Sequence, residues 1–128
     1  TMSGSYSFIG GGLENFGDAC SYGTVGGGAY NYIAGEYATI GGGAYHYSTA
    51  PYATISGGWD SFSYGYASTV VGGFYNNAVS SRAAIGGGRY NTAYGIYSTV
   101  VGGESKYVIV DRHNRLFASV LTCLVFVF

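Results

Sequence analysis

The sequence predicts an all-β protein whose chain winds into a parallel β-solenoid (β-roll) with turns of about 15 residues. The first observation is a period: an aliphatic residue followed by a glycine-rich run recurs seven times, spaced by 16 residues once and by 15 residues five times. Such a period is typical of repeat architectures, in which each unit buries its apolar side chains against its neighbours. The second is composition: 24 of 128 residues are glycine, and β-branched residues precede the glycine runs, which disfavours helices and suits short strands.

The aliphatic residue of each repeat is expected to point into the solenoid. It ends a four-residue strand such as residues 37–40, whose side chains alternate between two faces. The small residue shares the inward face with the aliphatic residue, and the tyrosine and threonine share the outward face. The predicted strands are residues 22–25, 37–40, 52–55, 67–70, 82–85 and 97–100. The inward core ladder is Ile9, Val25, Ile40, Ile55, Val70, Ile85 and Val100, and the outward rows contain Tyr37, Tyr52, Tyr97, Thr24, Thr39, Thr54, Thr69 and Thr99.

A second segment follows the glycines in each turn, and an asparagine leads its inward face. His46 and Ser61 replace the asparagine in two turns. Stacked amides can hydrogen-bond along such a column, which satisfies polar groups that are costly to bury without a partner. The column consists of Asn15, Asn31, Asn76 and Asn91. The flanking aromatic residues Phe16, Tyr30, Tyr32, Tyr45, Tyr47 and Phe62 are expected to point outward, and Tyr75 and Tyr90 belong to the same surface rows.

The glycine runs are interpreted as corners between strands. A phosphate-binding loop needs the spacing GxxxxGK[ST] between a strand and a helix, and residues 102–106 do not have it. Glycine instead allows positive φ angles at tight corners and a close approach between neighbouring backbones.

Beyond residue 103 the sequence changes, which divides the chain into a repeat domain over residues 1–103 and a C-terminal segment over residues 104–128. Two apolar runs flank a polar stretch in this segment and predict a β-hairpin. Asp111 and His113 lie in the predicted turn without a third ligand or a nucleophile, so we interpret the turn as a solvated loop.

The last apolar run is expected to need a partner, because it is too apolar to stand free in water. It would cap the solenoid or be donated as a strand to another subunit. An outer-membrane anchor would need several strands per chain, and the segment has room for two at most. The residues of this assembly segment are Leu116, Phe117, Val120, Leu121, Leu124, Val125, Phe126, Val127 and Phe128.

Charge and cysteine composition argue against several classes of partner. Only 11 residues are charged and the net charge is −1, so neither nucleic acid nor an anionic membrane surface is expected to bind. The longest apolar stretch, residues 116–128, is shorter than the ~20 residues of a membrane-spanning helix. Cys20 and Cys123 form no motif for zinc or for a disulfide framework, so no metal and no cofactor is predicted.

An enzyme is not expected either. Cleavage of a glycoside needs two carboxylates that flank a cleft at a defined separation. Glu14 and Asp60 occupy the same repeat position but lie three turns apart, about 14 Å at the spacing of β-strands. The sequence therefore predicts no catalytic residues.

The phrase ATIGGG at residues 38–43, with its neighbours, resembles the head repeats of YadA-like trimeric autotransporter adhesins and similar repeats of phage and viral fibres. The resemblance covers roughly residues 5–103. It implies a left-handed parallel β-roll, three chains side by side, with an inward Ile or Val before each Gly corner, as at Ile40 and Ile85. It also implies an extracellular location, on a cell or virion surface, and a role in attachment.

The sequence thus predicts a structural surface fibre or adhesin that self-associates as a homotrimer or an end-to-end filament. Each thin turn buries little apolar surface, so association is expected to supply the missing burial. Tyrosine offers a rigid apolar ring and a polar tip, which suits contacts with glycans, a host surface or neighbouring rods. The alternatives are tyrosines that only pack chain against chain, a viral or phage fibre segment, and ice binding by the threonine row, which Ala84 interrupts.

Overall fold

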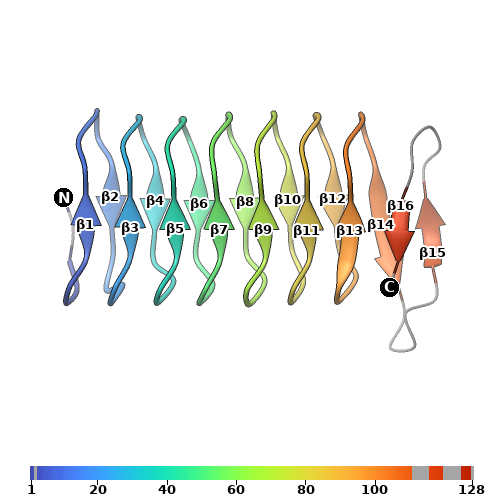
Figure 1. Cartoon of the computed structure of the whole chain (residues 1–128), viewed down its shortest axis with the longest axis horizontal. Coiled ribbons are helices and arrows are strands. Elements are labelled where there is room, and N and C mark those ends of the chain that lie inside the picture. Colours follow the sequence, from blue (N-terminus) through green and yellow to red (C-terminus); the bar gives the residue numbers. More distant parts are fainter. Residues whose placement is uncertain (2, 111–115, 120–124, 128) are drawn as a thin grey trace.

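The computed structural model is an all-β parallel solenoid of about 7 turns, as the sequence period predicts (Figure 1). The structure describes residues 1, 3–110, 116–119 and 125–127. These residues form strands and turns, and no helix occurs among them. The described part of the chain accordingly contains no helix of the length and apolar character that crossing a membrane requires.

Each turn contributes one short strand to each of two sheets, which form the two layers of the rod in Figure 1. We call them the Thr sheet, which carries the threonine row, and the Asn sheet, whose strands directly follow the asparagine column. The strands of the Thr sheet are, in spatial order, β1 (Phe8–Ile9), β3 (Thr24–Val25), β5 (Thr39–Ile40), β7 (Thr54–Ile55), β9 (Thr69–Val70), β11 (Ala84–Ile85), β13 (Ser98–Val100) and β16 (Val125–Val127). Those of the Asn sheet are β2 (Phe16–Gly17), β4 (Tyr32–Ile33), β6 (Tyr47–Ser48), β8 (Phe62–Ser63), β10 (Asn77–Ala78), β12 (Thr92–Ala93), β14 (Tyr107–Val110) and β15 (Leu116–Ser119).

The inward ladder is buried as predicted. Its members Val25, Ile40, Ile55, Val70, Ile85 and Val100 are at most 1% exposed, and Ile9 in the first turn is partly buried against them. Parallel pairing keeps these residues in register, since Ile40 pairs with Val25 on one side and with Ile55 on the other. The Asn sheet fills the opposite side with Ile33 and with small residues such as Ala78 and Ala93. The resulting core is thin, so each turn depends on its neighbours for burial.

The strands are shorter than the sequence predicts. Within residues 37–40, for example, only Thr39–Ile40 is regular strand. The preceding tyrosine lies in a corner with a positive φ, 56° at Tyr37 and 60° at Tyr52. This left-handed conformation is uncommon outside glycine, and it accompanies a hydrogen bond in which the Tyr37 N–H donates to Ser21 O of the preceding turn, at 3.0 Å.

The glycine runs form the corners between the Thr sheet and the Asn sheet. The last glycine of each run has a positive φ, such as +92° at Gly28 and +88° at Gly43. A Cβ atom at Gly28 would lie 2.0 Å from Gly43 O in the next turn. Both expected roles of glycine, positive φ and close backbone approach, are therefore confirmed at this position.

The C-terminal segment closes the rod at one end. Strand β14 continues the Asn sheet in parallel with β12, and β15 then pairs with β14 in the antiparallel direction, which confirms the predicted hairpin. Strand β16 pairs antiparallel with β13 and so covers the last edge of the Thr sheet (Figure 1). Within a single chain the segment thus covers the edges of β13 and β14, and β16 and β15 become the edge strands of the two sheets.

Several residues named from the sequence lie outside the described residues. These are Asp111, His113, Val120, Leu121, Cys123, Leu124 and Phe128. The role of the last run in assembly stays a prediction, as does the division of the chain at residue 103.

Candidate functional site

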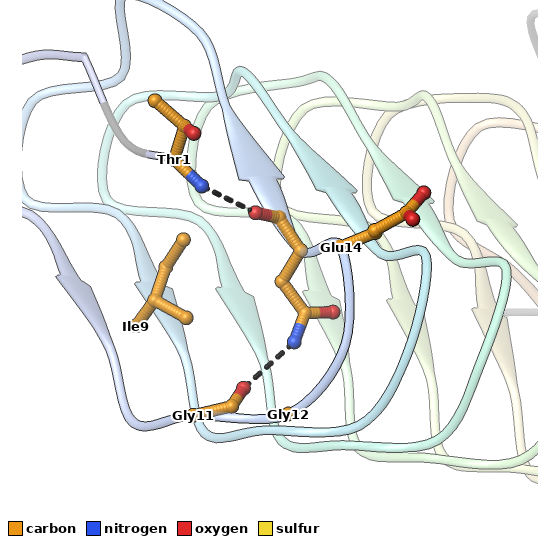
Figure 2. Close-up of a pocket in the computed structure, with 6 residues that line it drawn as sticks. Thr1, Ile9, Gly11, Gly12 and Glu14 are labelled. Atoms are coloured by element: carbon orange, nitrogen blue, oxygen red, sulfur yellow. Dashed lines mark hydrogen bonds between the residues drawn. The ribbon is translucent and has the colours of Figure 1, made fainter.

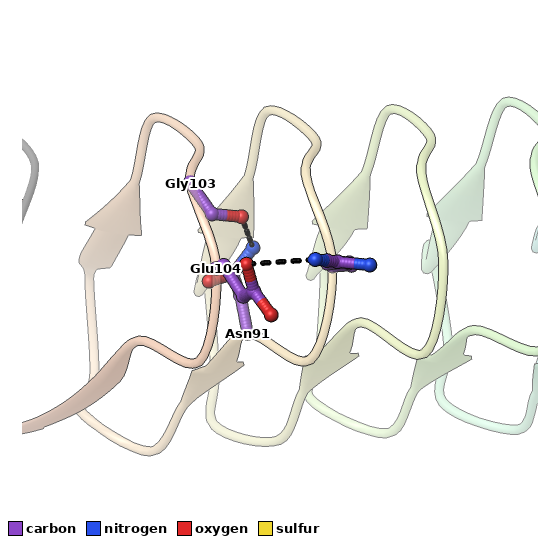
Figure 3. A network of polar contacts seen from close by, with 4 residues as sticks. Asn91, Gly103 and Glu104 are labelled. Atoms are coloured by element: carbon purple, nitrogen blue, oxygen red, sulfur yellow. Dashed lines mark hydrogen bonds and ion pairs between the residues drawn. The ribbon is translucent and has the colours of Figure 1, made fainter.

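The asparagine column bonds each turn to the next from inside the solenoid. Asn31, which is 1% exposed, donates from Nδ2 to Gly27 O of its own corner at 3.1 Å and to Gly43 O of the next corner at 3.0 Å. Its Oδ1 accepts the N–H of His46 at 3.1 Å. Asn91 repeats the pattern with Gly87 and Gly103, and Figure 3 shows its bond to Gly103.

This pattern corrects one detail of the sequence interpretation. Stacked amides were expected to bond to one another, but each amide bonds to the backbone of the adjacent turn. The reason is geometric: the glycine carbonyls of two consecutive corners point at the amide, and the next backbone N–H lies directly above its oxygen. A column of this kind satisfies backbone groups as well as the buried amides themselves, which would be costly to bury without partners.

His46 occupies the column position in the third turn and fits it less well. Its side chain is fully buried, and Nδ1 accepts the N–H of Ser61 at 3.2 Å. Nε2 is buried without a hydrogen-bond partner of suitable geometry, although the Gly58 backbone lies near enough to favour a proton on the ring. Burial is the larger effect and lowers the pKa of His46, because removal from water disfavours the charged imidazolium.

Replacing His46 with asparagine should therefore stabilise the protein by about 1 kcal/mol, because the amide can donate to both corner carbonyls. The substitution should also reduce acid sensitivity. Since the His46 pKa is lowered by folding, the unfolded chain takes up the proton more readily, and stability is lost as the pH falls below about 6.5. Thermal unfolding of both proteins between about pH 8 and about pH 5 measures this; an identical pH dependence in the two would contradict it.

On the outside, stacked rings form a row along the corner that leads into the Thr sheet. We call it the corner row. Its members are Tyr6, Tyr22, Tyr37, Tyr52, Tyr66, Arg82 and Tyr97. The ring centres of Tyr22 and Tyr37 lie 4.7 Å apart with planes 2° from parallel. Arg82 continues the row as a cation, 5.8 Å from the ring centre of Tyr66 and 5.1 Å from that of Tyr97, distances at which cation–π attraction operates.

Two further aromatic rows run along the rod. The glycine-corner row consists of Tyr30, Tyr45, Trp59, Phe74, Tyr75 and Tyr90. The Asn-sheet row consists of Phe16, Tyr32, Tyr47 and Phe62, with ring centres 5.4 to 5.8 Å apart. Both rows contain exposed rings, as the sequence predicts. In the first, the carboxylate of Asp60 beside Tyr75 raises the pKa of that phenol.

The direction of stacking decides what these rows offer to a partner. Nearly parallel rings with centres about 5 Å apart overlap face to face with an offset, so the rings of one row cover one another's faces along the rod axis. Ring edges and hydroxyl groups remain at the surface. The corner row therefore presents a regularly spaced line of phenol hydroxyl groups. It does not present flat ring faces on which a sugar could stack.

The threonine row lies in register on the Thr sheet. Thr39 pairs with Thr24 and with Thr54, and the row continues through Thr69. Ala84 then interrupts it before Thr99, as the sequence indicates. All five threonines are partly exposed.

Polar groups that could act on a small ligand are sparse. Among the described residues, no three His, Cys, Asp or Glu side chains gather closely enough to hold a metal ion. A cavity of about 170 Å³ opens at the N-terminal end, where Thr1, Ile9, Glu14 and the first glycine corner line it (Figure 2). Glu14 is its single carboxylate, and Asn15 Nδ2 is already bonded to Gly11 O. Cys20 lies buried in the core.

Among the described residues, one ion pair is found, and it lies exposed in the last turns of the solenoid. Arg89 Nη2 and Glu104 Oε2 are 3.0 Å apart and occupy the same position in consecutive turns (Figure 3). Both side chains are more than half exposed, so this pair contributes little to stability.

The sequence matches no known family model, and no curated protein sequence matches it.

Sequence reasoning found the tyrosines and threonines of the surface but missed two features of the rows. Trp59, Phe74 and Tyr66 belong to them, although each departs from the tyrosine repeat by one position. The Arg82 guanidinium fills a gap in the corner row, which the repeat alignment could have shown because Arg82 occupies the tyrosine position.

Proposed function

We propose that this chain is a structural surface-fibre or adhesin segment that self-associates side by side through its aromatic rows. The supporting observation is the exposure of three aromatic rows, each of which extends over four or more turns of the rod, since extended exposed apolar surface marks interaction sites. The resemblance to YadA-like heads points the same way and suggests a trimer on a cell or virion surface.

The spacing of the rows supports a second solenoid as the partner. Successive strands of a β-sheet repeat at about 4.8 Å, and the tyrosine hydroxyl groups of the corner row follow the same spacing. A neighbouring copy has the same repeat, so contacts made at one turn would recur at the successive turns of Tyr22, Tyr37 and Tyr52. At the parallel stacks of the corner row, a glycan would have to bind through hydrogen bonds to hydroxyls and ring edges, because the ring faces there are covered by their neighbours.

Sedimentation velocity of the full chain over a wide concentration range tests this proposal. We expect the wild-type protein to associate, and the double variant Tyr32→Ser, Tyr47→Ser in the Asn-sheet row or the triple variant Tyr22→Ser, Tyr37→Ser, Tyr52→Ser in the corner row to weaken association by about tenfold or more. The matched control is Thr39→Ser, Thr54→Ser on the Thr sheet. A wild-type protein that stays monomeric at every concentration would rule the proposal out.

The register of the threonine row supports ice binding as a second candidate. Hydroxyls at Thr24, Thr39, Thr54 and Thr69 repeat in register on one sheet. Because the row is one threonine wide, we favour the structural fibre role over ice binding. Thermal hysteresis equal to that of an inert protein would eliminate ice binding.

A further inference from the structure

Five pairs of tyrosines from successive turns stack with nearly parallel planes. In the corner row, the ring centres of Tyr6 and Tyr22 lie 5.2 Å apart, those of Tyr22 and Tyr37 4.7 Å, and those of Tyr37 and Tyr52 5.1 Å. The other two pairs are Tyr30 with Tyr45 and Tyr75 with Tyr90, in the glycine-corner row. All five pairs have interplanar angles of 10° or less.

The paired rings point the same way because their backbones are alike. Tyr22, Tyr37 and Tyr52 have φ angles of 60°, 56° and 60° and occupy the same place in consecutive turns. We therefore expect the hydroxyl groups, and the ring carbons ortho to them, to face their counterparts in the next turn. The rings are 43 to 49% exposed, so a soluble oxidant can reach them.

We propose that these stacked pairs are sites of oxidative modification, at which hydrogen peroxide and a haem peroxidase join the phenols of successive turns as dityrosine. Each phenol loses one electron and one proton to become a phenoxyl radical. The two radicals couple through their ortho carbons, a C–C bond forms, and the ring hydrogens at these carbons move to the oxygens. One peroxide molecule accepts the two electrons and two protons and leaves as two molecules of water.

Such a bond would link neighbouring turns covalently. A link between Tyr22 and Tyr37 closes a loop of one solenoid turn and restricts the unfolded chain, so the folded rod should gain stability. The inference concerns bonds within one chain and does not depend on self-association.

The chain contains tyrosines of similar exposure that lack a parallel tyrosine neighbour. Tyr64 is 45% exposed and stacks on Phe62, and Tyr66 is 46% exposed and meets Tyr52 edge-on at 63°. These residues can form a phenoxyl radical but have no tyrosine stacked face to face for coupling. Because they are exposed but not stacked on another tyrosine, they show whether stacking or exposure decides which tyrosines become cross-linked.

The test is to treat the dilute full-length chain with hydrogen peroxide and a haem peroxidase. The monomer is isolated in denaturant, its dityrosine fluorescence is measured, and the cross-linked peptides are mapped by mass spectrometry. We expect cross-links within the monomer at the five stacked pairs, and a higher thermal unfolding temperature than that of the untreated protein. Cross-links found solely between chains would overturn the proposal.

Two single variants sharpen the result. Tyr37→Phe keeps a stacked ring but removes the phenol from two of the five pairs, so at low conversion the dityrosine yield of the monomer should fall by about two fifths, and every cross-link at residue 37 should vanish. Tyr64→Phe is the matched control and should leave the yield unchanged. Equal losses in the two variants would show that exposure alone decides reactivity, which contradicts the proposal.

Discussion

Replacing Asn76 with alanine is expected to lower the free energy of unfolding by about 3 kcal/mol, because three backbone groups lose their partner and one of them, the N–H of Asn91, is buried. Asn76 Nδ2 donates to Gly72 O at 2.8 Å and to Gly88 O at 3.1 Å, and its Oδ1 accepts the N–H of Asn91 at 3.1 Å. The Asn76 side chain is fully buried, and so is the bond from the Asn91 N–H, whereas the bonds to the two glycine carbonyls are partly exposed. Chemical denaturation followed by circular dichroism measures the loss.

The next residue provides a matched control of the same type. Asn77 begins β10 and is partly exposed, and its side-chain oxygen has no hydrogen-bond partner. Asn77→Ala should therefore change stability by less than about 1 kcal/mol. If the two alanine variants were equally stable, the inward column would not hold the turns together as described.

Replacing Gly28 with alanine is expected to cost about 3 kcal/mol or more, or to prevent folding, because two effects add. The φ of +92° is unfavourable for alanine, and the new Cβ would lie 2.0 Å from Gly43 O and 2.9 Å from Asn31 Nδ2. Both contacts belong to the corner and column that join this turn to the next. Thermal and chemical denaturation of the purified variant measure the effect.

The neighbouring glycine separates close approach from the general cost of losing a glycine. A Cβ at Gly27 would meet no atom within 4 Å, so Gly27→Ala should change stability by about 1 kcal/mol or less. A strongly destabilised Gly27→Ala protein, or an unaffected Gly28→Ala protein, would contradict this account of the corners.

The repeat period made the architecture predictable from sequence. Once Ile40 and Ile55 are aligned, alternation along the strand assigns the buried ladder and the outward threonines, and the structure confirms both. The burial of Asn31 and Asn91 followed from the same reasoning. These features depend on local pattern and on stacking, which a single sequence displays.

The conformation of the tyrosines could not be predicted in the same way. A tyrosine ahead of a β-branched residue favours a strand, yet Tyr37 takes a left-handed conformation, for which the cost of roughly 1–2 kcal/mol is similar in size to the gain from ring stacking, about 0.5–1.5 kcal/mol per pair. The hydrogen bond from Tyr37 N–H to Ser21 O and the stacks with Tyr22 and Tyr52 connect different turns. Contacts between turns thus override the local preference.

The hydrogen-bond partners of the column side chains could not be predicted from the sequence either. A column of amides suggests amide-to-amide bonds, and only the positions of the glycine carbonyls show that the backbone is the partner. Ser61 illustrates the consequence, since its hydroxyl donates to Trp59 O rather than to the next turn. The column is therefore weakest between the turns of Ser61 and Asn76.

The central claim is that buried column bonds hold the turns in register and so align the surface rows. Amide hydrogen exchange at single-residue resolution tests it most directly. We predict slow exchange, repeating every 15 residues with a gap at Asn76, at the N–H groups that donate to column side chains, namely those of Asn31, His46, Ser61, Asn91 and Lys106. The Asn76 N–H should exchange faster than that of Asn91. Rapid exchange at the column amides, or protection without this period, would contradict the account.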